Sequence, residues 1–283
     1  MWSALLRGFG GDLRATLLVG VATGLAVLGS AFAHAKDAKS FMGFRLLDLE
    51  DQKVKWQSPA FGQGAVVTYA YVNGPMRTAG ARNCADMVAP QHAHDPSGIK
   101  AEAFRQEVAA AFHMWEQVAN ITFQETDDPE TAGIVIGAQA KPVGRAFTNV
   151  SLRPAAENRK VIDRSLICLN PQKRWKVGFD GRLDVYDVRY TLAHEIGHAI
   201  GLDHPSASGA LMSYRYDERH HELQPGDIEG AALLYGPRLG TQTVSDTASI
   251  TTGSTTPRPQ PTGAPLGLGV ERSAPQGTPA APR

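Results

Sequence analysis

Three stretches of the chain repeat their apolar residues at the spacing of an α-helix. Within residues 100–119 one helical face carries six apolar side chains: Phe104, Val108, Ala111, Phe112, Trp115 and Val118. A second helix is expected to begin near Asp184 as its N-cap, with Asp187 in its first turn and Gly201 as its stop. A third is expected over residues 225–235, between a proline and a Gly-Pro pair.

Short runs rich in β-branched and aromatic residues alternate with turn signals, as strands do. The clearest run is residues 65–72, which an Asn-Gly-Pro turn follows. Further runs occupy residues 121–123, 133–137, 145–150 and 161–169. Because an amphipathic helix buries its apolar stripe against another element, we predict an α+β domain in which helices cover a twisted mixed sheet.

The two ends of the chain differ in composition from the middle. Residues 1–35 carry arginines before an apolar run that ends in small residues, which predicts an export signal that is cleaved from the mature protein. An uncleaved membrane anchor is the alternative, because the apolar run is nearly long enough to span a bilayer. Residues 241–283 are rich in Thr, Ser, Pro and Gly, which predicts a disordered tail.

These ends leave room for one folded unit. Residues 36–62 are too few to bury a core of their own and are interpreted as an N-terminal arm. The folded domain is therefore placed at residues 63–240 and is expected to begin near Gly64. We expect the mature protein to be a periplasmic or secreted monomer without a membrane segment.

Two further counts bear on partners and on the redox compartment. Lys plus Arg and Asp plus Glu each number 28, so no net charge attracts nucleic acid or an anionic membrane surface. The chain contains two cysteines, Cys84 and Cys168, and an oxidising compartment allows such a pair to close. We predict a disulfide between them, with two buried free thiols as the alternative.

The most informative segment is residues 194–204, which contains three histidines. His194 and His198 are four residues apart, so on a helix their imidazoles project from the same face and can reach one metal ion. Gly201 lets the backbone leave the helix with a positive φ, which brings His204 in as a third ligand. Three imidazoles leave a fourth position open for water, as in catalytic rather than structural zinc sites.

Glu195 follows the first histidine and carries the remaining chemistry. Zinc lowers the pKa of a bound water to about 7 and polarises a carbonyl oxygen. Glu195 can reach that water without binding the metal, so we expect it to act as general base and to pass the proton to the leaving amine. This pattern predicts a Zn²⁺-dependent hydrolase.

Residues 194–204 resemble the zinc motif of the metzincin peptidases at every fixed position, and residues 208–214 look like the Met-turn of that family. The resemblance implies that Met212 lies beneath the metal as an apolar floor. Within the metzincins, residues 65–236 are most similar to matrixins and serralysins: Ala210-Leu211-Met212 looks like matrixins, whereas Asp203-His204-Pro205 and Met212-Ser213-Tyr214 look like serralysins. The serralysin likeness implies that Tyr214 stabilises the oxyanion, with a packed aromatic as the alternative.

The resemblance implies a zincin fold, with an active-site helix, a second long helix and a C-terminal helix, and the activity of a metalloendopeptidase on protein or peptide substrates. A substrate peptide is expected to add as a strand to an edge at residues 145–150. A non-catalytic zinc-binding interaction module derived from a protease is the alternative, and a hydrolase of non-peptide amides is a third reading. The calcium-binding repeats of serralysins and the histidine cluster of the second zinc site of matrixins are missing, so the sequence does not assign a Ca²⁺ site. It also does not decide whether an inhibitor protein is a partner.

Two further short segments contain side chains that can bind a metal ion. Residues 92–95 hold two histidines and an aspartate but are interpreted as a solvated loop. Cys84 is similar to the cysteine that keeps matrixin zymogens latent by binding zinc, which is a minor hypothesis beside the disulfide.

Overall fold

The computed structural model describes residues 43–206, 209–238 and 268–272. The predicted export signal, residues 1–35, lies outside the described residues. Among the helices that are described, none is long and apolar enough to cross a membrane.

The strands come mainly in two runs, one before the first α-helix and one between the second and third α-helices. The strands are β1 Arg45–Leu46, β2 Asp48–Leu49, β3 Gln52–Lys53, β4 Ala65–Tyr71, β5 Met76–Arg77, β6 Asp86–Val88, β7 Ile121–Glu125, β8 Ile134–Gln139, β9 Ala146–Pro154, β10 Lys160–Leu169, β11 Trp175–Lys176, β12 Tyr186–Asp187, β13 Leu202–Asp203 and β14 Leu268–Arg272. The α-helices are α1 Gln91–His94, α2 Ala101–Val118, α3 Val188–Ala199 and α4 Pro225–Tyr235. The predicted first and third helices and the five predicted strand segments are all present.

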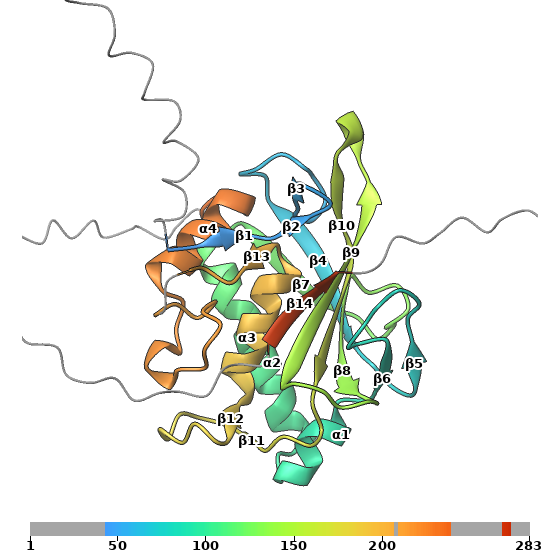
Figure 1. Cartoon of the computed structure of the whole chain (residues 1–283), viewed down its shortest axis with the longest axis vertical. Helices are drawn as coiled ribbons and strands as arrows, with labels where there is room; N and C mark the ends of the chain where they lie inside the picture. The colour runs from blue at the N-terminus through green and yellow to red at the C-terminus, as the bar shows by residue number, and fades with distance from the viewer. Residues whose placement is uncertain (1–42, 207–208, 239–267, 273–283) are drawn as a thin grey trace, which may run out of the picture. The chain divides into compact units, whose positions relative to one another are not determined.

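One mixed sheet forms the centre of the fold. Its main path runs β14-β9-β10-β8-β4-β7, and β5 and β6 extend it beside β8. Strand β10 is antiparallel to β9 and parallel to β8, and β4 is parallel to both β8 and β7. The predicted α+β class with a mixed sheet is therefore confirmed (Figure 1).

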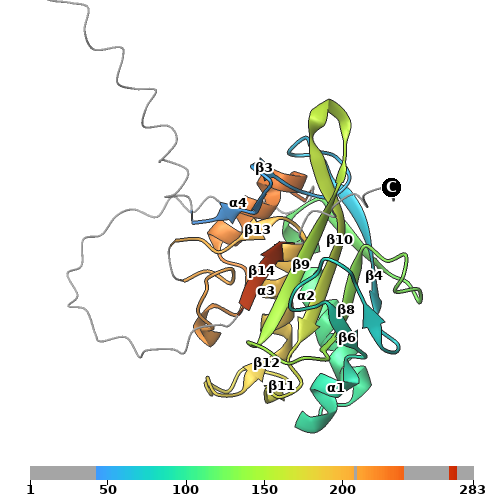
Figure 2. The same ribbon diagram turned by 45° about the vertical axis from the view of Figure 1, so that its right-hand side comes forward.

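The two longest helices lie together on one side of this sheet (Figure 2). Helix α2 buries the predicted stripe, and the Trp115 indole N–H donates to the carbonyl oxygen of Ala193 in α3 at 2.9 Å. Every side chain of α3 except Arg189 is buried. Helix α3 is thus enclosed by the sheet and α2, although the sequence predicted one apolar face.

Helix α3 begins later than predicted. Its N-cap is Asp187, whose carboxylate accepts the backbone N–H of Tyr190 at 2.8 Å, so Asp187 does not lie in the first turn and Asp184 is not the cap. Residues Tyr186–Asp187 instead form β12, which pairs in parallel with β11. Asp184 and Asp187 are both suitable N-cap residues. The pairing of β12 with β11 keeps the chain extended up to Asp187, so the helix begins after Asp187.

The N-terminal arm belongs to the folded unit, so the predicted beginning near Gly64 is too late. Leu47, Val54 and Trp56 are buried in the main core. The backbone N–H of Leu47 donates to the Gly201 carbonyl oxygen at 2.8 Å, and the Trp56 indole donates to the end of α3 at Ala199. The arm cannot form a core alone, but it completes the core around the end of α3.

The C-terminal segment also departs from its prediction. Residues 241–283 were expected to be disordered, yet Leu268–Arg272 form β14, which pairs in parallel with β9. Figures 1 and 2 both show β14, in dark red, running alongside β9 on the side of α3. The expected edge of the sheet at residues 145–150 is therefore covered by a strand of the same chain.

The two cysteines form the predicted disulfide between Cys84 and Cys168. Cys168 lies near the end of β10, and Cys84 lies in the loop between β5 and β6. Both residues are buried in a small second core on the face of the sheet opposite to the helices. Because Cys84 is bonded to sulfur, it has no free thiol with which to bind zinc.

Candidate metal centre

Helix α3 carries two of the three predicted ligands on one buried face. The Nδ1 atom of His194 lies 2.8 Å from the carbonyl oxygen of Leu211, and that of His198 lies 2.9 Å from the carbonyl oxygen of Leu202. A carbonyl oxygen can only accept, so Nδ1 carries the proton in each ring. The Nε2 atom of each ring therefore keeps its lone pair for a metal.

His204 joins them because the chain reverses at Gly201. Gly201 has φ of +107°, and a Cβ atom there would lie 2.3 Å from the carbonyl oxygen of Val54, so the position requires glycine. Residues Leu202–Asp203 then form β13, which pairs with β1 of the arm. Arg45 of β1 forms an ion pair with Asp203 at 3.1 Å, which fixes the residue before His204.

The three Nε2 atoms converge at the spacing of a tetrahedral metal site. His204 Nε2 lies 3.1 Å from His194 Nε2 and 3.3 Å from His198 Nε2. Two ligands at 2.0–2.1 Å from a tetrahedral zinc ion are about 3.3 Å apart. Within the described part of the chain, this is the one group of three or more His, Cys, Asp or Glu side chains whose ligand atoms gather within 4.8 Å. The residues present therefore fit a zinc ion.

The protonation state of the cluster also suits a metal. Burial and the neighbouring His204 lower the pKa of His194 to about 3. Burial lowers the pKa of His198 well below its usual range, and it lowers the pKa of His204 as well. All three imidazoles are neutral at pH 7, which is the form that binds metal.

Glu195 is completely buried beside this cluster and is held by a residue of the sheet. The Thr148 hydroxyl in β9 donates to Glu195 Oε2 at 2.6 Å and also lies 3.0 Å from the Glu195 carbonyl oxygen. Glu195 Oε1 has no hydrogen-bond partner among the residues that the structure describes. One carboxylate oxygen is thus fixed, and the other is available to accept a proton.

Burial favours the neutral form of Glu195 when no metal ion is bound. Burial raises the pKa of Glu195 to about 8, although the hydrogen bond from Thr148 and the charge of Arg145 oppose this rise. Arg145 immediately precedes β9, and its guanidinium lies 3.4 Å above the centre of the Tyr186 ring. The positive charge of a zinc ion at the three imidazoles would favour the ionised carboxylate, which is the form that can accept a proton.

The Met212 side chain packs closely against α3 at Gly197. A Cβ atom on Gly197 would be 2.2 Å from the Met212 sulfur, so the glycine between the two helical histidines gives the thioether room to approach the helix. Asp227, in the first turn of α4, accepts the backbone N–H groups of Leu211 and Met212 at 2.8 and 3.1 Å. The start of α4 therefore fixes the Met-turn.

Tyr214 lies at the edge of the cluster and is 50% exposed. Its ring centre is 5.2 Å from that of His204, with the two planes at 81°. The ring is therefore not a packed core aromatic, which was the alternative reading, and it lies beside a predicted ligand.

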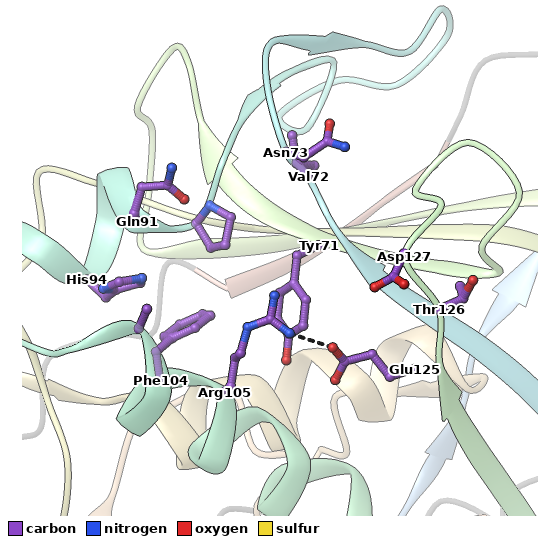
Figure 3. Close-up of a pocket in the computed structure, with 12 residues that line it drawn as sticks. Tyr71, Val72, Asn73, Gln91, His94, Phe104, Arg105, Glu125, Thr126 and Asp127 are labelled. Atoms are coloured by element: carbon purple, nitrogen blue, oxygen red, sulfur yellow. Dashed lines mark hydrogen bonds and ion pairs between the residues drawn. The ribbon is translucent and has the colours of Figure 1, made fainter.

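The other candidate sites do not share these properties. Residues 92–95 are not a loop but include the end of α1, and His94 is buried with its Nδ1 atom 2.8 Å from the carbonyl oxygen of Ile99. A pocket nearby is lined by residues of β4, α1 and α2 and by residues 125–127 (Figure 3). In this pocket Arg105 pairs with Glu125 at 2.5 Å and covers the Tyr71 ring.

Three contributions to the site were not predicted from the sequence: Thr148, Asp227 and the arm strand β1. Thr148 contacts a residue 47 positions away, and nothing in the local sequence of β9 indicates that contact. Asp227 lies within the third predicted helix, but its hydrogen bonds to the Met-turn depend on the tertiary fold. Strand β1 is too short to give a periodic signal.

Comparison with known proteins identifies the family. The matrixin family profile matches residues 89–236, which is more than half of the chain. The chain therefore belongs to the matrixins, so its closer relationship within the metzincins lies with them, and the serralysin-like features are local.

Several curated proteins are similar to this chain. The Arabidopsis thaliana metalloendoproteinase 1-MMP is 29% identical over 51% of this chain and 41% of its own length. Human matrix metalloproteinase-19 is 29% identical over 50% of this chain and 28% of its own length, and human stromelysin-3 is 30% identical over 55% and 34%. The alignments thus span less than half of each of these relatives.

Proposed function

We propose that this protein is a zinc-dependent metalloendopeptidase, with His194, His198 and His204 as zinc ligands and Glu195 as general base. The observation that carries the proposal is the convergence of three Nε2 atoms beside a buried carboxylate with one unpartnered oxygen. Membership of the matrixin family and the names of the relatives support the same activity.

The reaction divides between the metal and the side chains around it. The imidazoles of His194, His198 and His204 would hold the zinc ion, which would supply a Lewis acid for the peptide carbonyl and for a water near neutral pH. Glu195 Oε1 takes the proton from the attacking water and delivers it to the leaving amine. Thr148 holds the other oxygen of that carboxylate, so the base is in place before substrate arrives.

Two further residues have supporting roles in this proposal. Met212 forms the apolar floor under the ligands, because its side chain is buried against Gly197 of α3. The Tyr214 hydroxyl donates to the oxygen that becomes negative in the transition state, since its ring is accessible next to His204. An export signal at residues 1–35 would direct the enzyme to an oxidising compartment, in which its disulfide can form.

The chemistry of the site argues against the non-catalytic alternative. A module that used zinc only for structure would have no need of a buried carboxylate beside the metal, and structural zinc is usually closed by four protein ligands. Burying a carboxylate is costly, and one of the two oxygens of Glu195 has no hydrogen-bond partner among the described residues. The fold bears this cost at Glu195, which is understandable if the carboxylate works as a base.

Cleavage of an unfolded protein substrate tests the proposal. We expect the zinc-loaded full chain to cut the substrate, a chelator to abolish cleavage, and added zinc to restore it. Glu195→Gln, which keeps the shape of the side chain, should bind one zinc ion per chain and cut at least about 10³-fold more slowly, because general-base catalysis is lost together with the position of the attacking water. Bound zinc with no cleavage of any unfolded protein would contradict the proposed activity.

A further inference from the structure

The outer edge of β9 is occupied by a segment from the far end of the chain. Strand β14 pairs with it in parallel, and the paired residues run from Leu268 opposite Ala146 to Arg272 opposite Val150. The other edge of β9 is paired with β10. The backbone groups of β9 that face away from β10 are therefore used by β14.

This strand passes directly beside the proposed base. Val270 is opposite Thr148 in the β9–β14 pair, and Thr148 is the residue that holds Glu195. Figures 1 and 2 both show β14 on the α3 side of β9, along the helix that carries His194 and His198. Under the proposed function, an extended peptide that pairs with this stretch of β9 would bring its scissile bond near Glu195.

Only one strand can pair with a given edge. An extended peptide that adds to a sheet uses the unpaired N–H and C=O groups of the edge strand, which gives affinity with little demand on sequence. In this chain those groups of β9 already pair with β14 between residues 146 and 150. A substrate strand and β14 are therefore mutually exclusive on β9.

We propose that residues 268–272 act as an internal competitor that occupies the substrate-binding edge of β9 and must leave before a peptide can bind. The proposal rests on the proposed peptidase function for its biological meaning, but the competition for β9 can be tested without any catalysis. In this proposal, residues 268–272 and an extended substrate bind the same edge of β9.

The competition should be reversible because the strand is short and tethered. Five residues form few ladder hydrogen bonds, and a two-strand contact of this size is weak by itself. Tethering raises the effective concentration of the segment at β9 to the millimolar range. If the segment is in place in about nine molecules of ten, about one tenth are competent, and releasing it lowers the apparent Kd of a competing peptide about tenfold.

A binding experiment tests the competition without catalysis. The full chain carries Glu195→Gln, so that nothing is cut, together with Gly269→Pro and Val270→Pro. Successive residues direct their N–H groups to opposite edges of a strand, so two adjacent prolines remove a donor toward β9 whichever way the strand is turned. The matched control carries Gln276→Pro and Gly277→Pro, which place the same two prolines outside β14.

The probe is a fluorescein-labelled synthetic peptide of residues 264–275, followed by fluorescence anisotropy. We expect the variant with prolines in β14 to bind the probe about tenfold more tightly than the control does. Equal affinity of the two proteins for the probe would overturn the proposal. Hydrogen exchange gives a second readout, because the amides within residues 146–150 that face β14 should lose protection in the β14 variant and keep it in the control, whereas those that face β10 should stay protected in both.

The same prolines in a chain that retains Glu195 connect the competition to turnover. The KM for a long peptide substrate should fall at least threefold in the β14 variant with kcat unchanged, whereas the control should match wild type. Equal KM values, with tighter probe binding confirmed, would overturn the claim that tail and substrate share the edge. If no variant cuts any peptide, the proposed function fails, and the anisotropy result still decides whether β14 competes for β9.

Discussion

Replacing Thr148 by valine isolates the contact between the sheet and the proposed base. Thr148 is fully buried in β9, and its hydroxyl donates a hydrogen bond to Glu195 Oε2 at 2.6 Å. Valine keeps the β-branched shape that suits a strand but has no hydroxyl. The substitution therefore removes the hydrogen bond while it leaves the strand and the zinc ligands in place.

The size of the effect follows from the charge of the acceptor. A hydrogen bond to a charged group contributes about 1.5–3 kcal/mol. Every 1.36 kcal/mol of lost transition-state stabilisation is a factor of ten in rate, so kcat should fall about 10- to 150-fold if the bond is needed to position Glu195. The KM should change little, because Thr148 is buried and its side chain contacts the base.

The assay compares three proteins with matched zinc content. Thr148→Val is measured beside wild type and beside Thr148→Ser, which keeps the hydroxyl and loses one methyl group. We expect the serine variant to retain kcat within about threefold, since its donor remains. The acidic limb of the pH profile should move to higher pH in Thr148→Val, because the Thr148 hydrogen bond is one of the groups that lower the pKa of Glu195.

Two results would refute this reasoning. If Thr148→Val binds zinc, folds normally and turns over within twofold of wild type, the hydroxyl does not position the base. If Thr148→Ser loses as much activity as Thr148→Val, the methyl group and its packing matter, and the hydrogen bond is not responsible.

Three other predictions concern parts of the site and its support. Tyr214→Phe should lower kcat by at least about tenfold with little change in KM or thermal stability, because it removes one oxyanion donor from a half-exposed ring; unchanged kcat would leave Tyr214 without this role. Replacing Cys84 and Cys168 by serine should reduce the free energy of unfolding by about 2–5 kcal/mol in a denaturant titration, since the disulfide closes a loop with a sequence separation of 84; a loss below about 1 kcal/mol would mean that the bond hardly constrains the unfolded chain. In the metal-free protein, stability should fall as pH drops below about 6.5. His194 and His198 have folded pKa values below their unfolded ones, so each lowers the free energy of unfolding by about 1.4 kcal/mol per pH unit until its folded pKa is reached. Glu195, whose folded pKa is raised to about 8, opposes one of these two losses, so the net fall is about 1.4 kcal/mol per pH unit; a flat stability profile between pH 6.5 and 5 would contradict the burial of the histidines.

Local patterns predicted much of the fold and the chemical centre of the site. The apolar stripe from Phe104 to Val118 gave the first long helix because its period depends only on neighbouring residues. The helical spacing of His194 and His198, and the glycine that ends the helix before His204, gave the ligand cluster for the same reason. In each case the physical cause lies within about ten residues of sequence.

The features that were missed depend on contacts between distant segments. Asp184 and Asp187 are both good caps, and only the pairing of β11 with β12 favours the second. Strand β14 lies in a segment whose overall composition indicates disorder, although Leu266, Leu268 and Val270 alternate with Gly267 and Gly269 as a strand would. Alternation over five residues is a weak signal until β9 provides an edge to pair with.

X-ray absorption at the zinc edge of the zinc-loaded full chain tests the central claim most directly. We predict one zinc ion per chain, bound by three imidazole nitrogens and one oxygen at about 2.0–2.1 Å, and loss of this signature in His198→Ala. A spectrum dominated by sulfur ligands, or an unchanged nitrogen shell in His198→Ala, would contradict the proposed site.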